Sequence, residues 1–469
     1  MARLSRTKKK ELYHSIKGAR DIFGDEYRLR EWFIERAKHV ATFYGFGPIA
    51  TPHLERAELF GTTLGGTTDV VQKQMYAFRT RGGESVALRP EGTAPIMRAY
   101  IEHGMHTWPQ PVLFWYAGNF FRHENPQRGR WREFYQFGLE VLGTEDPVAD
   151  GLVIHVAVLM LREVGLQNVL VHLNSLGCKE CRAVWRKELV AYFRKHGNAL
   201  CKDCKRRLKE NPLRILDCKE ERCREASTNA PQSVSYLCAH CKQHFREVLE
   251  HLDDAGIAYV LDHLLVRGLD YYSRTTFEIF FEKPGESAES DNSETKTEVG
   301  TEESEKKKLL ALGGGGRYDY LGEVIGSRNV PAVGMALGVD RIIPLLREHG
   351  KIPKSLQEPP KVFFVQLGTT AKRKSLHLME ELRKAKIPLA QSLSKDSLKS
   401  QLRIASRLGV FYAAILGQKE ALDDTIIIRD MDSGAQETLP FVKSIEYLKS
   451  KLRGKGQPRP PEITDEEDE

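Results

Sequence analysis

The chain has 469 residues, of which 41% are hydrophobic, and its formal net charge is +7. This length can bury more than one core, which excludes a small structural peptide and predicts two or three domains. The longest apolar runs, such as residues 151–161, are too short to cross a bilayer, and residues 1–14 lack the apolar core of a signal peptide, so we expect a cytoplasmic protein without membrane spans.

The first strongly periodic segment is residues 25–45, where leucine, aromatic and alanine side chains recur at helical spacing and Gly45 ends the run. This segment predicts an amphipathic core helix. Several strand-like runs follow, and the clearest are 111–122 and 132–143. We expect these two runs to be antiparallel neighbours, joined by an arginine-rich loop over residues 123–131.

One face of this predicted hairpin carries residues that an ordinary core would not contain. Phe134, Gln136, Gly138 and Glu140 share a face because side chains alternate along a strand. A buried carboxylate needs a partner, and a glycine beside it leaves room for a ligand. The pattern therefore indicates a bound cation or amine near Glu140, with a neighbouring arginine as the alternative partner.

Arginines crowd the end of the first strand and the loop. Arg122 ends that strand, where its planar fork suits a phosphate group. A solvated surface is the alternative for the loop arginines, and for Arg132 it is the expected one because no partner is indicated.

All eight cysteines lie in four close pairs within a basic segment. The pairs are Cys178/Cys181, Cys201/Cys204, Cys218/Cys223 and Cys238/Cys241. Two thiolates one short turn apart supply half of a tetrahedral shell, so the pairs indicate structural Zn²⁺. Four pairs could form two closed sites, but the sequence does not say which pairs combine. Reduced cysteines in a small subdomain are the alternative.

The remaining patterns divide the chain into an α+β domain with an antiparallel sheet flanked by helices, and a separate α/β domain. The second domain is predicted because strands and helices alternate after a Pro-rich linker. Residues 361–455 carry 18 Lys/Arg against 10 Asp/Glu, which suits a polyanionic partner. The predicted boundaries are 1–350 for the α+β domain, 178–255 for an inserted cysteine-rich, mainly helical module, 283–308 for a disordered acidic loop, 361–453 for the α/β domain and 454–469 for a flexible tail.

Residues 121–140, FRHENPQRGRWREFYQFGLE, closely resemble motif 2 of the class II aminoacyl-tRNA synthetases in its histidyl-tRNA synthetase form. Further segments resemble that family in the same order along the chain. They are motif 1 at 44–55, the amino-acid-binding segment at 87–98, a histidine-specific signature at 265–278, a second signature at 312–321 and motif 3 at 331–342. An ordered set over nearly the whole chain is much more specific than any single motif.

The resemblance implies a histidine–tRNA ligase that uses ATP and Mg²⁺ to form histidyl-adenylate and then acylates the 3′ end of tRNA(His). The implied histidine-binding residues are Glu91, Thr93, Gln136, Glu140, Arg267, Tyr271 and Tyr272. The implied ATP-binding residues are Arg122, Glu124, Arg130, Phe134 and Arg341, and catalysis is assigned to Arg122, Arg267 and Arg341.

The resemblance also implies partners for the rest of the chain. Gln127 and Arg128 would face the acceptor end of tRNA, the C-terminal α/β domain would bind the anticodon, and motif 1 would lie near a homodimer interface. The alternative function is a non-catalytic paralogue that acts as a regulatory or tRNA-sensing module. Retention of the three catalytic arginines and of the C-terminal domain argues against that alternative.

The second signature, motif 3 and the acidic segment before them each have one further feature. Arg317, Tyr318 and Asp319 follow a glycine run and match the second signature, where close backbone approach to the amino acid is expected. Asp340 precedes Arg341 where many class II enzymes have glutamate, which shortens the carboxylate's reach. The acidic segment 283–308 is longer than expected between two strands of this family.

Overall fold

The computed structural model describes residues 13–66, 68–126, 129–283, 309–326, 328–353, 356, 360–394 and 397–453. The chain forms two compact units, the first ending at Ile352 and the second beginning at Pro353. The predicted acidic loop beyond Lys283 and the predicted tail 454–469 lie outside the described residues. Within the described ranges, no helix has both the length and the apolar character needed to cross a membrane.

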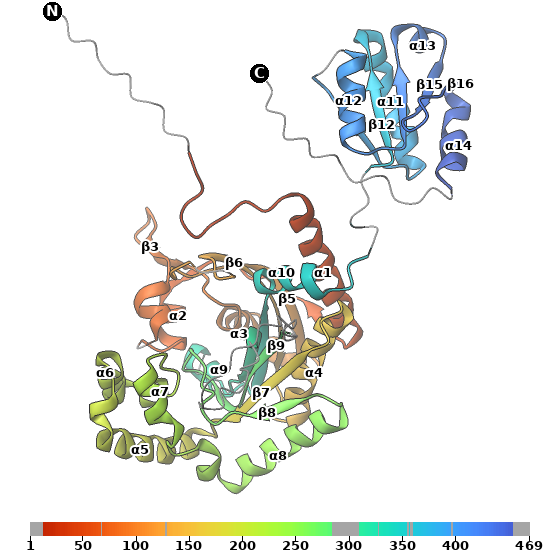
Figure 1. Ribbon diagram of the computed structural model, residues 1–469. Helices are drawn as coiled ribbons and strands as arrows, with labels where there is room; N and C mark the ends of the chain where they lie inside the picture. The colour runs from red at the N-terminus through yellow and green to blue at the C-terminus, as the bar shows by residue number, and fades with distance from the viewer. Residues whose placement is uncertain are drawn as a thin grey trace, which may run out of the picture. The chain divides into compact units, whose positions relative to one another are not determined.

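An eight-stranded sheet forms the centre of the first unit, in the order β1-β5-β6-β11-β10-β9-β7-β8 (Figure 1). The strands are β1 Gly47–Pro48, β5 Val112–Phe121, β6 Glu133–Leu142, β7 Val169–Ser175, β8 Tyr259–Leu261, β9 Ser273–Glu282, β10 Leu309–Arg317 and β11 Ala332–Gly338. The six inner strands are antiparallel, and β1 and β8 pair in parallel at the two edges. The predicted antiparallel sheet and its β5–β6 hairpin are therefore confirmed.

Strand register lines up small residues across the middle of this sheet. Tyr116 pairs with Gly138, Gly138 with Ala336, Ala336 with Gly314, and Gly314 with Glu278. Residues that pair across strands project from the same face. The three small residues leave a shallow floor between Tyr116 and Glu278, and the ring of Tyr116 occupies the space that a Cβ at Gly138 would need.

Helices cover the opposite face of the sheet. The main hydrophobic core joins that face to α1 (Gly24–Phe43), α4 (Pro147–Glu163), α8 (Ala239–Asp254) and α10 (Val339–His349). The predicted helix over 25–45 corresponds to α1. Phe137, Leu139 and Val141 of β6 point into this core. The polar alternate residues of β6 consequently face the other way, as the period-two pattern predicts.

Shorter elements build the rim on the face that carries the glycine row. The helices are α2 Ala57–Thr63, η1 Val70–Gln74, α3 Thr93–Glu102, η2 Met105–Thr107 and α9 Leu321–Gly326. A small antiparallel sheet, β2-β4-β3, accompanies them, with bounds β2 Leu54–Arg56, β3 Ala77–Arg79 and β4 Ser85–Leu88. Their apolar residues form a second core cluster with Tyr116 and Phe120 of β5.

The cysteine-rich segment between β7 and α8 forms a helical subdomain (Figure 1). Its helices are α5 Lys179–Lys195, η3 Gly197–Ala199, α6 Lys202–Glu210, η4 Pro212–Ile215, α7 Glu221–Thr228 and η5 Ser233–Tyr236. Trp185, Leu189 and Phe193 recur on one face of α5 and are fully buried, which fixes that helix to the second core cluster. By contrast, α8 packs on α4 as part of the main core.

The second unit contains a five-stranded mixed sheet in the order β13-β12-β14-β15-β16. Its elements are β12 Val362–Gln366, α11 Gly368–Lys384, β13 Leu389–Gln391, α12 Leu398–Arg407, β14 Tyr412–Leu416, α13 Gln418–Leu422, β15 Thr425–Asp430, β16 Gln436–Pro440 and α14 Phe441–Leu452. The predicted alternation of strands and helices is confirmed.

Candidate active site

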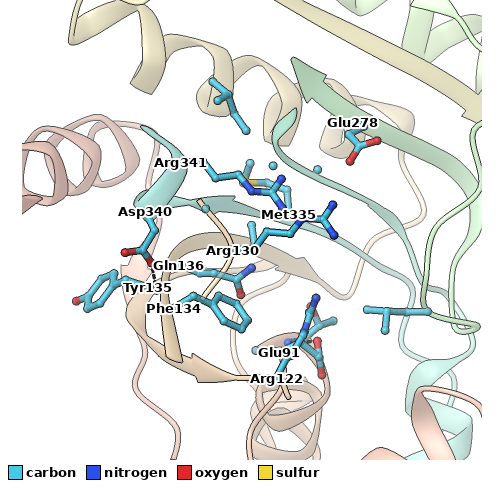
Figure 2. A pocket seen from close by; sticks show the side chains of 18 of the residues that line it. Glu91, Arg122, Arg130, Phe134, Tyr135, Gln136, Glu278, Met335, Asp340 and Arg341 are labelled. Atoms are coloured by element: carbon cyan, nitrogen blue, oxygen red, sulfur yellow. Dashed lines mark hydrogen bonds between the residues drawn. The ribbon is translucent and has the colours of Figure 1, made fainter. Parts of the chain in front are cut away.

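A cavity of about 230 Å³ opens on the face of the sheet that carries the glycine row (Figure 2). Its walls come from the β5–β6 hairpin, the start of α3, the loop before β9 and the first turn of α10. Every described residue predicted to bind histidine or ATP lines this cavity except Glu140, which lies fully buried beside Thr93. Gln127 and Arg128, the predicted tRNA contacts, lie outside the described residues.

The carboxylate of Glu91 lies at the beginning of α3. It accepts the backbone N–H groups of Thr93 at 2.8 Å and Ala94 at 2.9 Å, and so caps a helix whose N-cap residue is glycine. The hydroxyl of Tyr271 donates to the same carboxylate at 3.2 Å. Burial raises the pKa of Glu91, while the two N–H groups oppose that shift. Glu91 therefore holds the helix start as well as forming part of the cavity wall.

Glu140 is the centre of a buried polar group. Its carboxylate accepts the hydroxyl of Thr93 at 2.8 Å and the hydroxyl of Tyr318 in a short hydrogen bond. Burial raises the pKa of Glu140 to about 8, and the charge of Glu91 adds to the shift although the two hydroxyl donors oppose it. A side chain at Gly334, the partner of Glu140 on β11, would collide with this carboxylate. Over the described ranges no arginine pairs with Glu140, so the alternative ion pair is not found there.

Arg267 reaches the cavity from the loop before β9. Its NH1 lies 3.5 Å from Oε1 of Glu278, and its guanidinium carbon lies 5.8 Å from the ring centre of Tyr272. Its Nε is buried and finds no hydrogen-bond acceptor among the described residues. The Oε1 atom of Gln136 is also buried and receives no hydrogen bond from those residues. Unpartnered buried polar atoms that line a cavity indicate a place for a ligand.

Glu278 lines the cavity, although no role was expected for it from the sequence. It is the last residue of the histidine-specific signature 265–278, so that signature and the alternation along β9 were the available signals. Its position depends on cross-strand register with Gly314, which places it at the end of the glycine row. Tyr116, at the other end of the row, also lines the cavity without having been predicted to do so.

Arg122, Arg130, Arg341 and Phe134 line the same cavity, and Figure 2 shows Arg122 beside Glu91. Arg122 donates from Nε to a backbone carbonyl at 2.9 Å, and its guanidinium carbon lies 5.3 Å from the ring centre of Phe134. Arg341 donates from NH1 to a carbonyl of β10 at 2.9 Å. Burial lowers the pKa of Arg341, and the neighbouring Arg130 and Arg122 lower it further. A bound polyanion would relieve this crowding of positive charge.

Asp340 orients the first turn of α10 despite having a shorter side chain than glutamate. Its Oδ2 accepts the backbone N–H of Tyr135 at 2.7 Å, and its Oδ1 accepts a hydrogen bond from Arg20 at 3.0 Å. The aspartate therefore ties the start of α10 to β6. This contact fixes the helix turn from which Arg341 extends.

Arg132 is half-buried and holds the N-terminal segment against the hairpin. Its NH1 donates to the carbonyl of Lys17 at 3.1 Å, and its Nε donates to the carbonyl of Glu124 at 3.2 Å. Its alkyl chain also fills the space beside Gly18. The expectation of a solvated surface arginine is wrong, because residues 17–18 return to this loop, a contact between distant segments that no local pattern indicates.

Arg317 lies in the core and does not line the cavity. Its side chain is fully buried, forms an ion pair with Asp150, and lies 3.3 Å from Asp319. Although burial acts against it, these two carboxylates raise the pKa of Arg317. Gly313 and Gly314, from the glycine run of the same signature, do line the cavity. Arg317 and Asp319 thus stabilise the fold behind the site.

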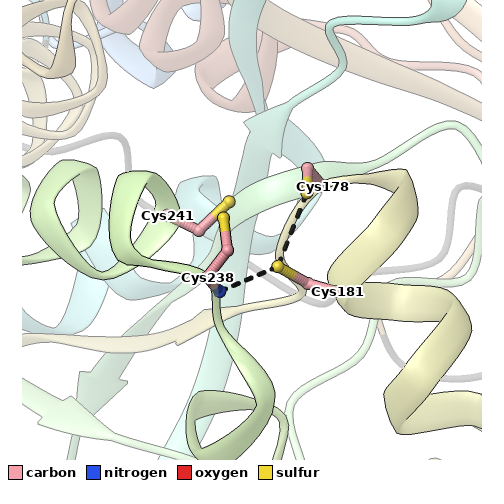
Figure 3. Close-up of side chains that lie close together, drawn as sticks. All are labelled: Cys178, Cys181, Cys238 and Cys241. Atoms are coloured by element: carbon pink, nitrogen blue, oxygen red, sulfur yellow. Dashed lines mark hydrogen bonds between the residues drawn. The ribbon is translucent and has the colours of Figure 1, made fainter.

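The eight cysteines form two clusters that lie outside the cavity wall. One cluster contains Cys178, Cys181, Cys238 and Cys241 (Figure 3), and the other contains Cys201, Cys204, Cys218 and Cys223. Within each cluster all four sulfur atoms lie within 4.8 Å of one another. The sequence left the combination of pairs open, and the structure combines the first pair with the fourth and the second with the third.

Known proteins are similar to the chain over most of its length. The family profile described as histidyl-tRNA synthetase matches residues 18–289, and the profile described as anticodon binding domain matches residues 361–451. The histidine–tRNA ligase of Desulforudis audaxviator MP104C is 44% identical over 88% of this chain and 92% of that protein. The histidine–tRNA ligase of Desulforamulus reducens MI-1 is 39% identical over 93% of this chain and 98% of that protein. The crystal structure of apo S. aureus histidyl-tRNA synthetase has a TM-score of 0.72 and 29% identity, and covers 93% of this chain and 100% of that chain.

The antiparallel sheet, its arginine-lined cavity and the appended anticodon-binding domain define a class II aminoacyl-tRNA synthetase. The predicted fold class is confirmed by these similarities. The chain belongs to the histidyl-tRNA synthetase family, which confirms the resemblance drawn from its motifs. Membership of this family also confirms the predicted ligase activity, and the non-catalytic alternative is not favoured.

Proposed function

We propose that this chain joins histidine to tRNA(His) in two steps at the cavity described above. Histidine and ATP react first to give histidyl-adenylate and pyrophosphate, and the acyl group then passes to the terminal adenosine of the tRNA. The observation that carries the proposal is that one cavity is lined both by carboxylates and tyrosines and by arginines with the ring of Phe134. An amino acid and a nucleoside triphosphate require these two environments.

The acidic part suits histidine. The α-ammonium and imidazole N–H groups of histidine can donate to Glu91 and to the unpartnered Oε1 of Gln136. Tyr271 and Tyr272, whose rings lie 4.6 Å apart, can orient the imidazole through their hydroxyls. Thr93 joins this group to the buried Glu140. A site built from such donors and acceptors discriminates against analogues that leave them unpaired.

The arginine-rich part suits ATP. Phe134 offers its ring to the adenine, and stacking on an aromatic side chain needs no base-specific hydrogen bond. Arg122 and Arg341 would hold the phosphates, with Arg130 as a further phosphate ligand. Glu124 lies near Arg130, and both Glu124 and Glu278 act on the charge of Arg341, so these two carboxylates supply oxygen donors of the kind that suits the Mg²⁺ brought in with ATP.

The chain's own residues would promote the first step by position and charge. The histidine carboxylate attacks the α-phosphorus in line and pyrophosphate leaves, so no covalent intermediate with the protein is needed. Arg267 lines the same cavity, where it can stabilise charge that develops on the α-phosphate. Mg²⁺ would neutralise charge on the leaving pyrophosphate.

The remaining parts of the proposal concern assembly and tRNA. We expect the second unit to bind the anticodon, in keeping with its family profile and with its basic composition. We also expect a cytoplasmic homodimer with motif 1 at its interface. Phe43, which immediately precedes motif 1, is 80% exposed and would be covered there. Sedimentation analysis at micromolar concentration tests the dimer, and a monomer would contradict it.

Histidine-dependent exchange between ATP and labelled pyrophosphate tests the first step directly. We expect exchange with histidine and none without it, followed by acylation of tRNA(His) transcript. Purified protein that binds histidine but supports no exchange would overturn the proposal in favour of a non-catalytic paralogue.

A further inference from the structure

The sulfur positions in both cysteine clusters have the spacing of a closed metal site. Zn–S bonds of about 2.3 Å in a tetrahedron place neighbouring sulfur atoms about 3.8 Å apart. Sγ of Cys178 lies 3.5 Å from Sγ of Cys181, and Sγ of Cys201 lies 4.0 Å from Sγ of Cys218. These separations bracket the tetrahedral value and far exceed a disulfide bond of about 2.05 Å.

Helix starts contribute to both clusters. Cys178, Cys201 and Cys238 are the N-cap residues of α5, α6 and α8, and in all four pairs the second cysteine is the third residue of a helix. Backbone N–H groups donate to the sulfurs, for example from Cys238 to Cys181 at 3.0 Å (Figure 3) and from Cys201 to Cys223 at 3.2 Å. The N–H groups at these helix starts provide hydrogen-bond donors for sulfur atoms that carry negative charge when they bind a metal ion.

We propose that each cluster binds one structural zinc ion, and that the two ions together hold the subdomain in contact with the loop that carries Arg267, Tyr271 and Tyr272. The outer site, Cys178/Cys181 with Cys238/Cys241, closes the base of the subdomain. The inner site, Cys201/Cys204 with Cys218/Cys223, closes a loop within it. Four thiolates complete each tetrahedron, so neither ion has a position for substrate or water, and neither takes part in the reaction.

The contacts to the catalytic loop arise from residues adjacent to, or enclosed by, the zinc ligands. Arg182, next to Cys181, donates to the carbonyl of Tyr272 at 2.7 Å. Asn211 and Arg214 lie between Cys204 and Cys218. Asn211 donates to the carboxylate of Asp270 at 2.8 Å, and Arg214 donates to the carbonyl of Gly268 at 3.0 Å.

A second cavity of about 220 Å³ lies between the subdomain and this loop, and these polar side chains line it. Its wall also includes Arg267 and Tyr272, which line the active-site cavity as well. Val266, Tyr271 and Tyr272 pack into the second core cluster, and on the side of the second cavity these hydrogen bonds fix the position of the loop. Loss of either zinc would free those bonding residues and so displace the histidine-binding side chains.

Metal analysis tests the two sites without any need for activity. Full-length protein purified under reducing conditions without chelator should contain two zinc ions per chain, and its Co²⁺-substituted form should show intense thiolate-to-cobalt charge-transfer absorption. Cys204→Ser should lose the ion of the inner site, and Cys241→Ser should lose the ion of the outer site. Each variant should therefore retain one ion. Wild-type protein with a zinc content closer to one or zero, cysteines paired as disulfides, or iron with sulfide in place of zinc would overturn the assignment.

A second experiment tests whether the subdomain holds the loop in position. Because it measures the KM for histidine, this part of the inference rests on the proposed function. The double variant Asn211→Ala/Arg214→Ala should keep both zinc ions, raise the KM for histidine about tenfold or more, and leave the KM for ATP nearly unchanged. Hydrogen–deuterium exchange at residues 265–272 should become faster. Arg206→Ala, which alters an exposed arginine of the same subdomain, is the matched control and should match the wild type.

Two results separate the possible failures. Normal histidine kinetics and unchanged amide exchange in the double variant, with two zinc ions bound, would overturn the coupling but not the metal sites. Absence of ATP–pyrophosphate exchange in the wild type would contradict the proposed function. The zinc content and the amide hydrogen exchange would then decide whether the two zinc ions hold the subdomain against the loop.

Discussion

The hydroxyl of Thr93 lies 2.8 Å from Oε1 of Glu140, so the first residue of α3 is bonded to a strand in the middle of the sheet. This bond joins the helix that Glu91 caps to a carboxyl group whose pKa is raised by burial to about 8. The polar end of the cavity is therefore one connected group, and a change in the charge of Glu140 reaches Thr93 directly.

The first prediction concerns the pH dependence of stability. Glu140 has a pKa of about 8 in the folded protein and an ordinary value near 4.5 when unfolded. The folded state therefore keeps a proton that the unfolded state releases, and the favourable contribution of that proton is lost as the pH rises from about 4.5 through about 8. Each pKa unit corresponds to about 1.4 kcal/mol.

Replacing Glu140 with glutamine removes this titration. The free energy of unfolding of Glu140→Gln, measured with urea in the absence of ligands, should fall less between pH 6 and pH 9 than that of the wild type. Glu133→Gln, at an exposed position on the same strand, should keep the wild-type slope. Identical slopes for Glu140→Gln and the wild type would contradict the assignment of a buried, protonated carboxyl group.

The second prediction concerns Arg267. Arg267→His should lower the rate of histidine-dependent ATP–pyrophosphate exchange by at least about 10²–10³-fold, because a positioned cationic donor for the α-phosphate is lost. Circular dichroism and thermal unfolding should remain close to those of the wild type. Arg246→His, at an exposed site on α8, provides the control. Exchange at near-normal rates in Arg267→His would refute the assigned role.

The third prediction separates the two parts of the cavity. Phe134→Leu keeps an apolar side chain but removes the aromatic face, so it should raise the KM for ATP by about 5- to 150-fold, the equivalent of about 1–3 kcal/mol of stacking. The KM for histidine should change much less. Steady-state exchange kinetics with each substrate varied in turn provide the measurement, and an effect confined to histidine would place the nucleotide elsewhere.

The fourth prediction concerns the buried ion pair behind the site. Asp150→Ala leaves the fully buried Arg317 with an incomplete set of partners, so it should reduce the free energy of unfolding by about 3–5 kcal/mol. Glu250→Ala, which removes an exposed ion pair with Arg246, should cost no more than about 1 kcal/mol. Urea unfolding measures both, and equal losses would show that Arg317 does not depend on Asp150.

Much of the fold could be predicted because the deciding signals are local. Period-two alternation gave the β5–β6 hairpin, and the position of Gln136 and Glu140 on one face followed from it. Helical spacing gave α1, and strand–helix alternation gave most of the second unit. Glu278 and Tyr116 were missed as cavity residues because their nearness depends on registers summed across five strands.

Other features depend on contacts between distant segments. Arg317 stands in a recognisable signature, yet its partner Asp150 is on α4, and no local pattern links the two. Arg132 meets residues 17–18 in the same unpredictable way. The cysteine pairs were found from their spacing, but their nested combination needed the arrangement of α5, α6, α7 and α8.

The central position of β11 has a consequence for the nascent chain. This strand is the last of its sheet to be synthesised, yet it lies between β6 and β10. Until residue 338 leaves the ribosome, the earlier strands can form only two half-sheets, each with an open edge of unpaired backbone groups. A chain that terminates before Ala332 would keep both edges exposed, which makes premature termination a source of aggregation-prone protein rather than of a smaller working domain.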